Sequence, residues 1–260
     1  MTDRSEPVDV QRFRDGLGDV SVQQGSIERG LRLLVRVVCR LVAWRVDANG
    51  FDGLPQRGAD PAGAGCLVVA APHRAWIDPF LVLAAWPPTA SRLVWFGDGA
   101  TMSRSWWRRW LFPRLGMIPI APGSGGPRAY ASLAAQVLRA GAALVIFPEK
   151  GPPSPPDETR TIAPGFAYLA LYAGAPVIPI VLAGTHRIVR GSSFTVDALA
   201  AIDVGPPDQE VFTPPGRRGA AELTERYRMA VANVLPARAA VTDARRPARE
   251  RWRWLATLFH

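Results

Sequence analysis

The stretch CLVVAAPHRAWIDP at residues 66–79 indicates the fold of this chain. Its first six residues are an apolar run of the length expected for a buried strand. A helix is predicted to follow at Ile77–Trp86, so the segment joins a strand to a helix through a turn that contains His73. The carboxyl ends of such strands open onto the functional crevice of an α/β sheet.

The alternation of short apolar runs and helical stretches continues on both sides of this segment. Further strands are predicted at Arg92–Phe96, Met117–Ile120, Ala142–Phe147 and Pro176–Leu182, with Trp44–Phe51 as another candidate. Helices are predicted between them at Ser103–Phe112, Arg128–Ala140 and Gly165–Ala173. This pattern favours an α/β fold, a single domain with a largely parallel central sheet flanked by helices.

The chain divides into four regions. Residues 1–25 are a polar lead, 26–45 a basic amphipathic helix, 46–215 the α/β domain and 216–260 C-terminal helices. Two such helices are predicted, one near Ala220–Leu235 and a basic one near Arg245–Phe259. The uncharged run Thr161–Thr185 is long enough to span a membrane, but its prolines and glycines favour a helix, a turn and a buried strand. The charged N-terminus lacks an apolar signal core, so we expect a chain that stays on the cytoplasmic side.

The charge of the chain is concentrated in three segments. The total is +9, but residues 26–45, 104–114 and 236–260 each carry +4, which leaves −3 for the rest. These segments also contain six of the nine tryptophans. Arginine and aromatic residues occur together both in membrane-binding and in nucleic-acid-binding proteins. Because the basic segments also have apolar helical faces, an anionic membrane surface is favoured over nucleic acid as the binding partner. We therefore expect a peripheral protein on the cytoplasmic face of the cell membrane, with no nucleic-acid partner.

His73 and Asp78 are the candidate catalytic pair. If a turn follows His73, Asp78 can fold back and accept a hydrogen bond from one imidazole nitrogen, which leaves the other nitrogen free as a general base. The alternative is a histidine that only caps the following helix. A second polar cluster, Phe147-Pro148-Glu149-Lys150-Gly151, follows the predicted strand Ala142–Phe147 and contains the only lysine of the chain. Considered alone, this second cluster could be a surface loop. Because charged residues follow two strands of one predicted sheet, at His73 and at Glu149, a shared site is favoured.

Four ordered blocks together resemble the glycerophospholipid acyltransferase family, and within it the bacterial 1-acylglycerol-3-phosphate acyltransferases. The blocks are the His-x-x-x-x-Asp motif at His73 and Asp78, Leu115–Ile120, Phe147–Glu149 and Ala175–Ile180. The resemblance implies a glycerol-3-phosphate acyltransferase-like fold. It also implies acyl transfer from an acyl thioester, carried by coenzyme A or acyl carrier protein, to a hydroxyl of a lysophospholipid. His73 would act as the base and Asp78 as its partner, with no cofactor and no metal.

The chain departs from the family pattern at two places. The acidic residue and phosphate-binding arginine that usually follow the second block are replaced by Ala121-Pro122, and Pro152-Pro153 stand where the third block usually has Thr-Arg. The expected substrate-binding residues are Arg74, Arg128, Phe147, Pro148, Glu149, Lys150, Gly151 and Arg160. Of these, Arg128, Lys150 and Arg160 are candidates to bind the acceptor's phosphate. Two alternatives stay open. The acceptor could be non-phosphorylated, a glycolipid or an aminolipid, or the chain could be a membrane-binding protein without enzymatic activity.

Overall fold

The computed structural model describes residues 29–42, 44–54, 65–98, 104–106, 109–110, 116–120, 126–150, 155–186 and 188–245. The predicted polar lead at 1–25 lies outside these residues. So do half of the residues of the helix predicted at Ser103–Phe112, almost all of the one predicted at Arg245–Phe259, and Gly151.

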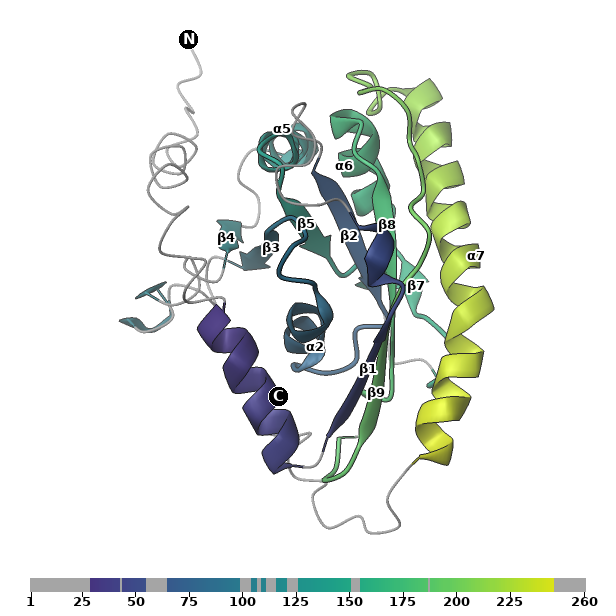
Figure 1. Cartoon of the computed structure of the whole chain (residues 1–260). Coiled ribbons are helices and arrows are strands. Elements are labelled where there is room, and N and C mark those ends of the chain that lie inside the picture. Colours follow the sequence, from purple (N-terminus) through teal and green to yellow (C-terminus); the bar gives the residue numbers. More distant parts are fainter. Residues whose placement is uncertain are drawn as a thin grey trace.

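A seven-stranded sheet forms the centre of the molecule (Figure 1). Its strands in spatial order are β1 (Arg45–Asn49), β9 (Ser193–Ala198), β8 (Val177–Ala183), β2 (Cys66–Ala71), β5 (Ala143–Ile146), β3 (Leu93–Asp98) and β4 (Met117–Ile120). All neighbouring pairs are parallel except β8 and β9, which are antiparallel. The predicted α/β fold with a largely parallel sheet is therefore confirmed, and the edge formed by β9 and β1 runs against the other five strands.

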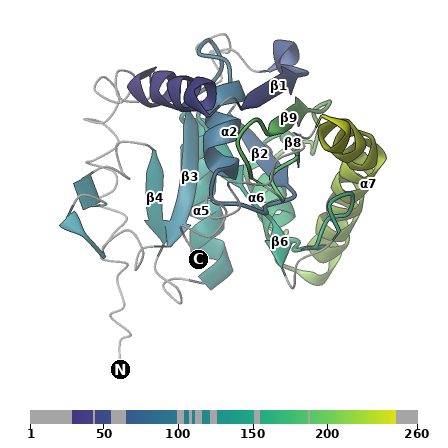
Figure 2. The same cartoon turned by 90° about the horizontal axis from the view of Figure 1, so that it is seen from below.

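Helices cover both faces of this sheet (Figures 1 and 2). One face carries α5 (Gly126–Arg139), α6 (Gly165–Ala173) and α7 (Pro214–Ala244), and the other carries α2 (Asp78–Ala85) and a helix at residues 29–41. The remaining elements are the short helix η1 (Phe51–Gly53) and the ribbon of β6 (Glu149–Lys150) and β7 (Thr161–Ile162). The described part of the chain contains no helix with the length and apolar character needed to cross a bilayer.

The central strands are buried on both sides, which explains their continuous apolar sequences. All six residues of β2 are buried. Val68 belongs to the core on the α2 side, whereas Leu67 and Val69 belong to the core under α5, α6 and α7. Because successive strand residues point to opposite faces, a strand between two helical layers must be apolar throughout.

Two of the predicted outer segments have other limits in the structure. The basic helix predicted at 26–45 is helical over the described residues 29–41 and ends before Arg45, where the chain is already a strand. The helix predicted near Ala220–Leu235 spans Pro214–Ala244, and its Tyr227 and Leu235 belong to the core of the sheet. The core is therefore continuous across the predicted boundary at residue 215.

The helical spacing of Arg29, Arg32, Arg36 and Arg40 predicts that all four share one face apart from the apolar residues, but the structure does not expose all of them. Arg32 is buried, and its guanidinium donates a hydrogen bond to the backbone carbonyl of Trp86, the residue that follows α2. A buried guanidinium needs acceptors, and the free carbonyl at a helix C-terminus supplies one. Five apolar side chains of this helix are exposed, namely Leu33, Leu34, Val37, Val38 and Leu41.

Replacing Leu67 on β2 by alanine is expected to lower the free energy of unfolding by about 2–5 kcal/mol, because the truncation leaves a cavity in a fully packed core. The matched control is Leu33→Ala, since Leu33 is 63% exposed. Urea unfolding of both variants measures the difference. Equal destabilisation by the two substitutions would contradict the layered core described here.

Candidate active site

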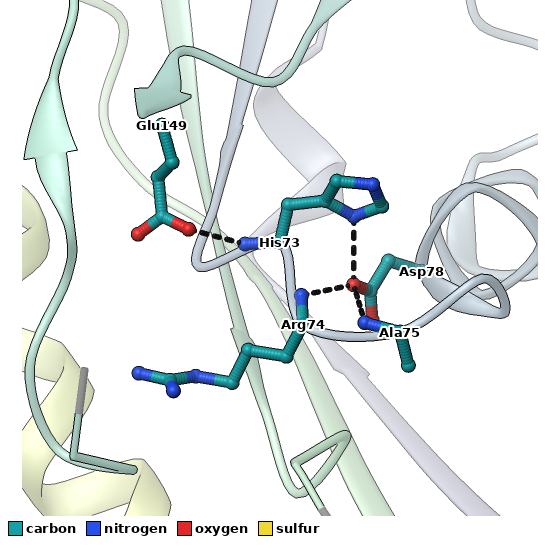
Figure 3. A network of polar contacts seen from close by, with 5 residues as sticks. All are labelled: His73, Arg74, Ala75, Asp78 and Glu149. Carbon is teal, nitrogen blue, oxygen red and sulfur yellow. Dashed lines mark hydrogen bonds and ion pairs between the residues drawn. The ribbon is translucent and has the colours of Figure 1, made fainter. Parts of the chain in front are cut away.

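His73 and Asp78 lie together at the carboxyl end of β2, as the spacing predicts. His73 Nδ1 is 2.8 Å from Asp78 Oδ2 (Figure 3). Asp78 is the first residue of α2, so the turn between the strand and the helix fixes both ends of this contact. The imidazole is partly exposed, whereas the carboxylate is completely buried.

Asp78 organises the whole turn through a single carboxylate oxygen. Besides His73 Nδ1, Oδ2 accepts hydrogen bonds from the backbone N–H groups of Arg74 at 2.7 Å and Ala75 at 2.8 Å. These three donors compensate for the burial of a charged group. Because a carboxylate only accepts, His73 carries its proton on Nδ1 when the ring is neutral, and Nε2 is left with a free lone pair.

Glu149 holds the same turn from the neighbouring strand end. Its Oε2 accepts the backbone N–H of His73 at 2.8 Å, and its Oε1 accepts the backbone N–H of Arg160 at 2.9 Å (Figure 3 shows the first of these). Glu149 also begins β6, which pairs with β7 and closes the Pro-rich excursion between them. Both oxygens of this carboxylate therefore bind backbone and connect β2, β5 and the excursion.

Stacked aromatic rings hold the imidazole of His73 in one orientation. Phe147 stacks on His73 with a centroid distance of 4.3 Å and an interplanar angle of 28°. Trp95 in turn lies 6.3 Å from Phe147 at 18°. Together with the bond to Asp78, this stack restricts rotation of the imidazole, so Nε2 has a defined direction.

A cavity of about 1460 Å³ opens beside His73. Most of the side chains around it are apolar, and they come from both faces of the sheet and from the helix at residues 29–41. They include Leu31, Pro79, Phe80, Leu83, Trp95, Phe96, Met117, Val145, Ile146, Phe166 and Leu169. A large apolar cavity with a few polar groups suits a ligand with a long hydrocarbon part.

The structure places the other predicted site residues in two groups. Five of them line the cavity, namely Arg128, Phe147, Pro148, Glu149 and Lys150. The two others that the structure describes, Arg74 and Arg160, support the excursion. Arg74 donates hydrogen bonds to the carbonyls of Pro155 and Glu158, and its side chain leads away from the imidazole (Figure 3). Burial lowers the pKa of Arg74, an effect that Glu149 opposes and Arg160 reinforces.

Tyr168, Phe212 and Arg217 are among the cavity residues that were not predicted from the sequence. Tyr168 lies on α6, Phe212 just before α7 and Arg217 near the start of α7. The spacing of Tyr168 and Tyr172 places both rings on one face of α6 and was an available signal. Phe212 lies in a Pro-rich connection and Arg217 follows it. No periodic sequence pattern marks a site at either position. Within the described ranges, no three His, Cys, Asp or Glu side chains lie together in a way that could hold a metal ion.

Comparison with known proteins agrees with this geometry. The sequence model of the family described as Acyltransferase matches residues 50–183, a span that contains His73, Asp78 and Glu149. Among solved structures, the chain is similar to the 1-acyl-sn-glycerophosphate (LPA) acyltransferase PlsC from Thermotoga maritima. The TM-score is 0.61 at 17% sequence identity, over 87% of this chain and 83% of that chain, which shows a shared fold. No curated protein matches the chain in sequence.

Glu149→Gln is expected to lower kcat by about tenfold or more and to leave KM nearly unchanged. The amide offers one acceptor oxygen in place of two, so either His73 or Arg160 loses the acceptor of its N–H and the turn loosens. Glu225→Gln on α7 is the matched control, because this exposed carboxylate pairs only with Arg228 among the described residues. Full activity of Glu149→Gln would contradict the positioning role.

Proposed function

Since the chain belongs to the Acyltransferase family, we propose that it transfers an acyl group from an acyl thioester to a hydroxyl of a lysophospholipid such as 1-acylglycerol-3-phosphate. One observation carries this proposal. The His73–Asp78 pair, with Nδ1 bound and Nε2 free, lies beside an apolar cavity large enough for hydrocarbon chains. The PlsC of Thermotoga maritima, whose fold is similar, is by its name an acyltransferase for such an acceptor.

The proposed reaction needs one base and one leaving thiolate. His73 Nε2 takes the proton of the acceptor hydroxyl while the oxygen attacks the thioester carbonyl. Asp78 stabilises the imidazolium that forms. The C–O ester bond forms, the C–S bond breaks, and the proton on His73 passes to the departing thiolate. No covalent bond to the enzyme is required, and the histidine returns to its neutral form.

The sequence itself favours a second candidate acceptor. Ala121-Pro122 stand where the resembled family usually has an acidic residue and the arginine that binds the acceptor's phosphate, and Pro152-Pro153 stand where its third block usually has Thr-Arg. An acceptor without a phosphate, such as a glycolipid or an aminolipid, would not need the phosphate-binding arginine. The two acceptors differ in charge, so a panel of both kinds separates them.

We also propose that the enzyme works as a peripheral protein on an anionic bilayer. The helix at residues 29–41 supports this, because it exposes five apolar side chains and also the exposed arginines Arg29, Arg36 and Arg40. Apolar side chains can enter the interface while arginines meet anionic head groups. Leu31 of the same helix lines the cavity, so a lipid acceptor would have a short path from the membrane to His73.

His73→Ala is expected to lower acyl transfer by roughly 100- to 10,000-fold, since the variant loses its general base. Asp78→Asn should lower it nearly as much, because an amide cannot keep the proton on Nδ1 in the same way. Labelled palmitoyl-CoA with lysophosphatidic acid and with uncharged lyso-glycolipids, followed by lipid mass spectrometry, measures both rate and acceptor. His186→Ala is the control, since His186 lies beside Asp243. Undiminished transfer by His73→Ala would rule out the mechanism.

Changing Leu34 and Leu41 together to serine is expected to weaken binding to phosphatidylglycerol-containing vesicles by about tenfold or more, because two exposed apolar anchors are lost. Met229→Ser is the matched control, as Met229 is similarly exposed but lies on α7. Vesicle co-sedimentation measures the partition. Unchanged co-sedimentation of the double variant would show that this helix does not contribute to membrane binding.

A further inference from the structure

The helix at residues 29–41 forms one wall of the cavity beside His73. Leu31 of this helix lines the cavity, and so do Phe80 and Leu83 of α2. Leu31 also packs against the apolar core that contains Leu83. The two helices lie side by side on this face of the sheet, the helix at residues 29–41 in purple (Figures 1 and 2). Their separation therefore sets the width of the cavity on this side.

Few side chains attach this wall to the rest of the molecule. Among the described residues 29–41, only Arg32 and Cys39 are buried, and Leu31 and Val35 are half-buried. Arg32 and Cys39 are seven residues apart, which is about two turns, so both lie on the inner side of the helix. A surface helix usually attaches through a stripe of apolar side chains. Here a charged side chain occupies part of that stripe.

The two ends of this helix are held by different contacts. At its C-terminal end the chain continues into β1, and the indole N–H of Trp44 donates to the carbonyl of Val189 at 2.8 Å. The Trp44 ring also packs edge-on against Phe194 at a centroid distance of 5.4 Å. Nearer the N-terminal end, the guanidinium of Arg32 donates to the carbonyl of Trp86. The end that carries Leu31 therefore depends on the contact of Arg32.

Trp86 is a fixed partner for this contact. It ends α2 and is 1% exposed. Its indole N–H donates to the carbonyl of Ser91 at 2.7 Å, and its ring packs edge-on against Phe51 at 6.2 Å. Carbonyls at the C-terminal end of a helix lack partners within the helix, and a buried guanidinium needs acceptors. The hydrogen bond between Arg32 and Trp86 satisfies both needs only while the two helices stay together.

We propose that Arg32 is a positioning residue for substrate binding, which holds the helix at residues 29–41 against α2 and keeps Leu31 in the cavity wall. The inference rests on the proposed acyl transfer for the kind of substrate, a lipid with a long hydrocarbon chain. Without the contact, the end that carries Leu31 should move away from α2, while the sheet and the turn at His73 stay folded. A hydrocarbon chain in the cavity would then lose apolar contacts.

The two cysteines of the chain report this movement directly. Cys39 lies on the inner side of the helix, whereas Cys66 lies in β2 and is completely buried. Both are free thiols. Burial raises the pKa of Cys39 and raises that of Cys66 to about 12, so both thiols should react slowly in the folded chain. Labelling of Cys39 therefore measures release of the helix, and labelling of Cys66 measures opening of the sheet.

Iodoacetamide labelling of the full chain, resolved by peptide mass spectrometry, tests the proposal. Arg32→Met keeps an apolar stem but loses the hydrogen bond, so Cys39 should react about tenfold faster or more, with Cys66 unchanged. Arg36→Met is the matched control, since Arg36 is exposed on the same helix. Arg32→Lys keeps a charged donor, so its Cys39 should react more slowly than that of Arg32→Met.

Binding of cis-parinaric acid, a fluorescent long-chain fatty acid, measures the effect on the cavity without turnover. Its Kd should rise about fivefold or more in Arg32→Met and stay unchanged in Arg36→Met, because only the first variant loosens the wall. In the acyl-transfer assay, the KM for lysophosphatidic acid should rise in Arg32→Met with kcat nearly unchanged, since the contact between His73 and Asp78 is untouched.

Equal Cys39 labelling in Arg32→Met and Arg36→Met would overturn the proposal. Faster Cys39 labelling with unchanged binding of the fatty acid would overturn the role in substrate binding. Should Arg32→Met also speed the labelling of Cys66, Arg32→Lys takes its place as the smaller change, and a Cys39 rate there equal to that of the unchanged chain would contradict the proposal. Since labelling and fatty-acid binding require no turnover, failure here is separate from failure of the proposed reaction.

Discussion

The active-site turn depends on the burial of one carboxylate. Asp78 has no solvent exposure, so its charge must be met by protein donors, and His73, Arg74 and Ala75 supply three of them to one oxygen. The three hydrogen bonds to Oδ2 fix the turn from β2 into α2, the position of the imidazole and the nitrogen that bears its proton. The same contacts that stabilise the turn therefore orient the proposed base, His73.

The parallel sheet brings a second carboxylate to this turn. β2 and β5 are neighbours in parallel register, with Val69 opposite Ile146, so the segments that follow both strands emerge at one edge. Glu149 can thus reach the backbone of His73 although 76 positions separate the two residues. The stacked Phe147 arrives with it. Histidine, carboxylate and aromatic ring are positioned by strand order, and the proposed acyl transfer uses that edge.

Sequence predicts those parts of the molecule that depend on local pattern. Apolar runs locate the five parallel strands, and the His73–Asp78 spacing locates the candidate catalytic pair. It does not locate β9, because Ser193–Ala198 contains polar residues whose burial depends on distant partners such as Arg238, which binds Asp197. The direction of Arg32 depends likewise on Trp86, and the role of Glu149 on backbone groups of a turn far along the chain. Such pairings arise only when the chain is folded.

The tautomer of His73 tests the central claim most directly. Nitrogen-15 NMR of the imidazole, at a pH where the ring is neutral, distinguishes a protonated Nδ1 from a protonated Nε2. The chain has three histidines, so His186→Gln and His260→Gln identify the signals of His73. The structure predicts a proton on Nδ1 and an unprotonated Nε2, with this preference lost in Asp78→Asn. A proton on Nε2 in the unchanged protein would contradict the account, because the proposed base would have no free lone pair.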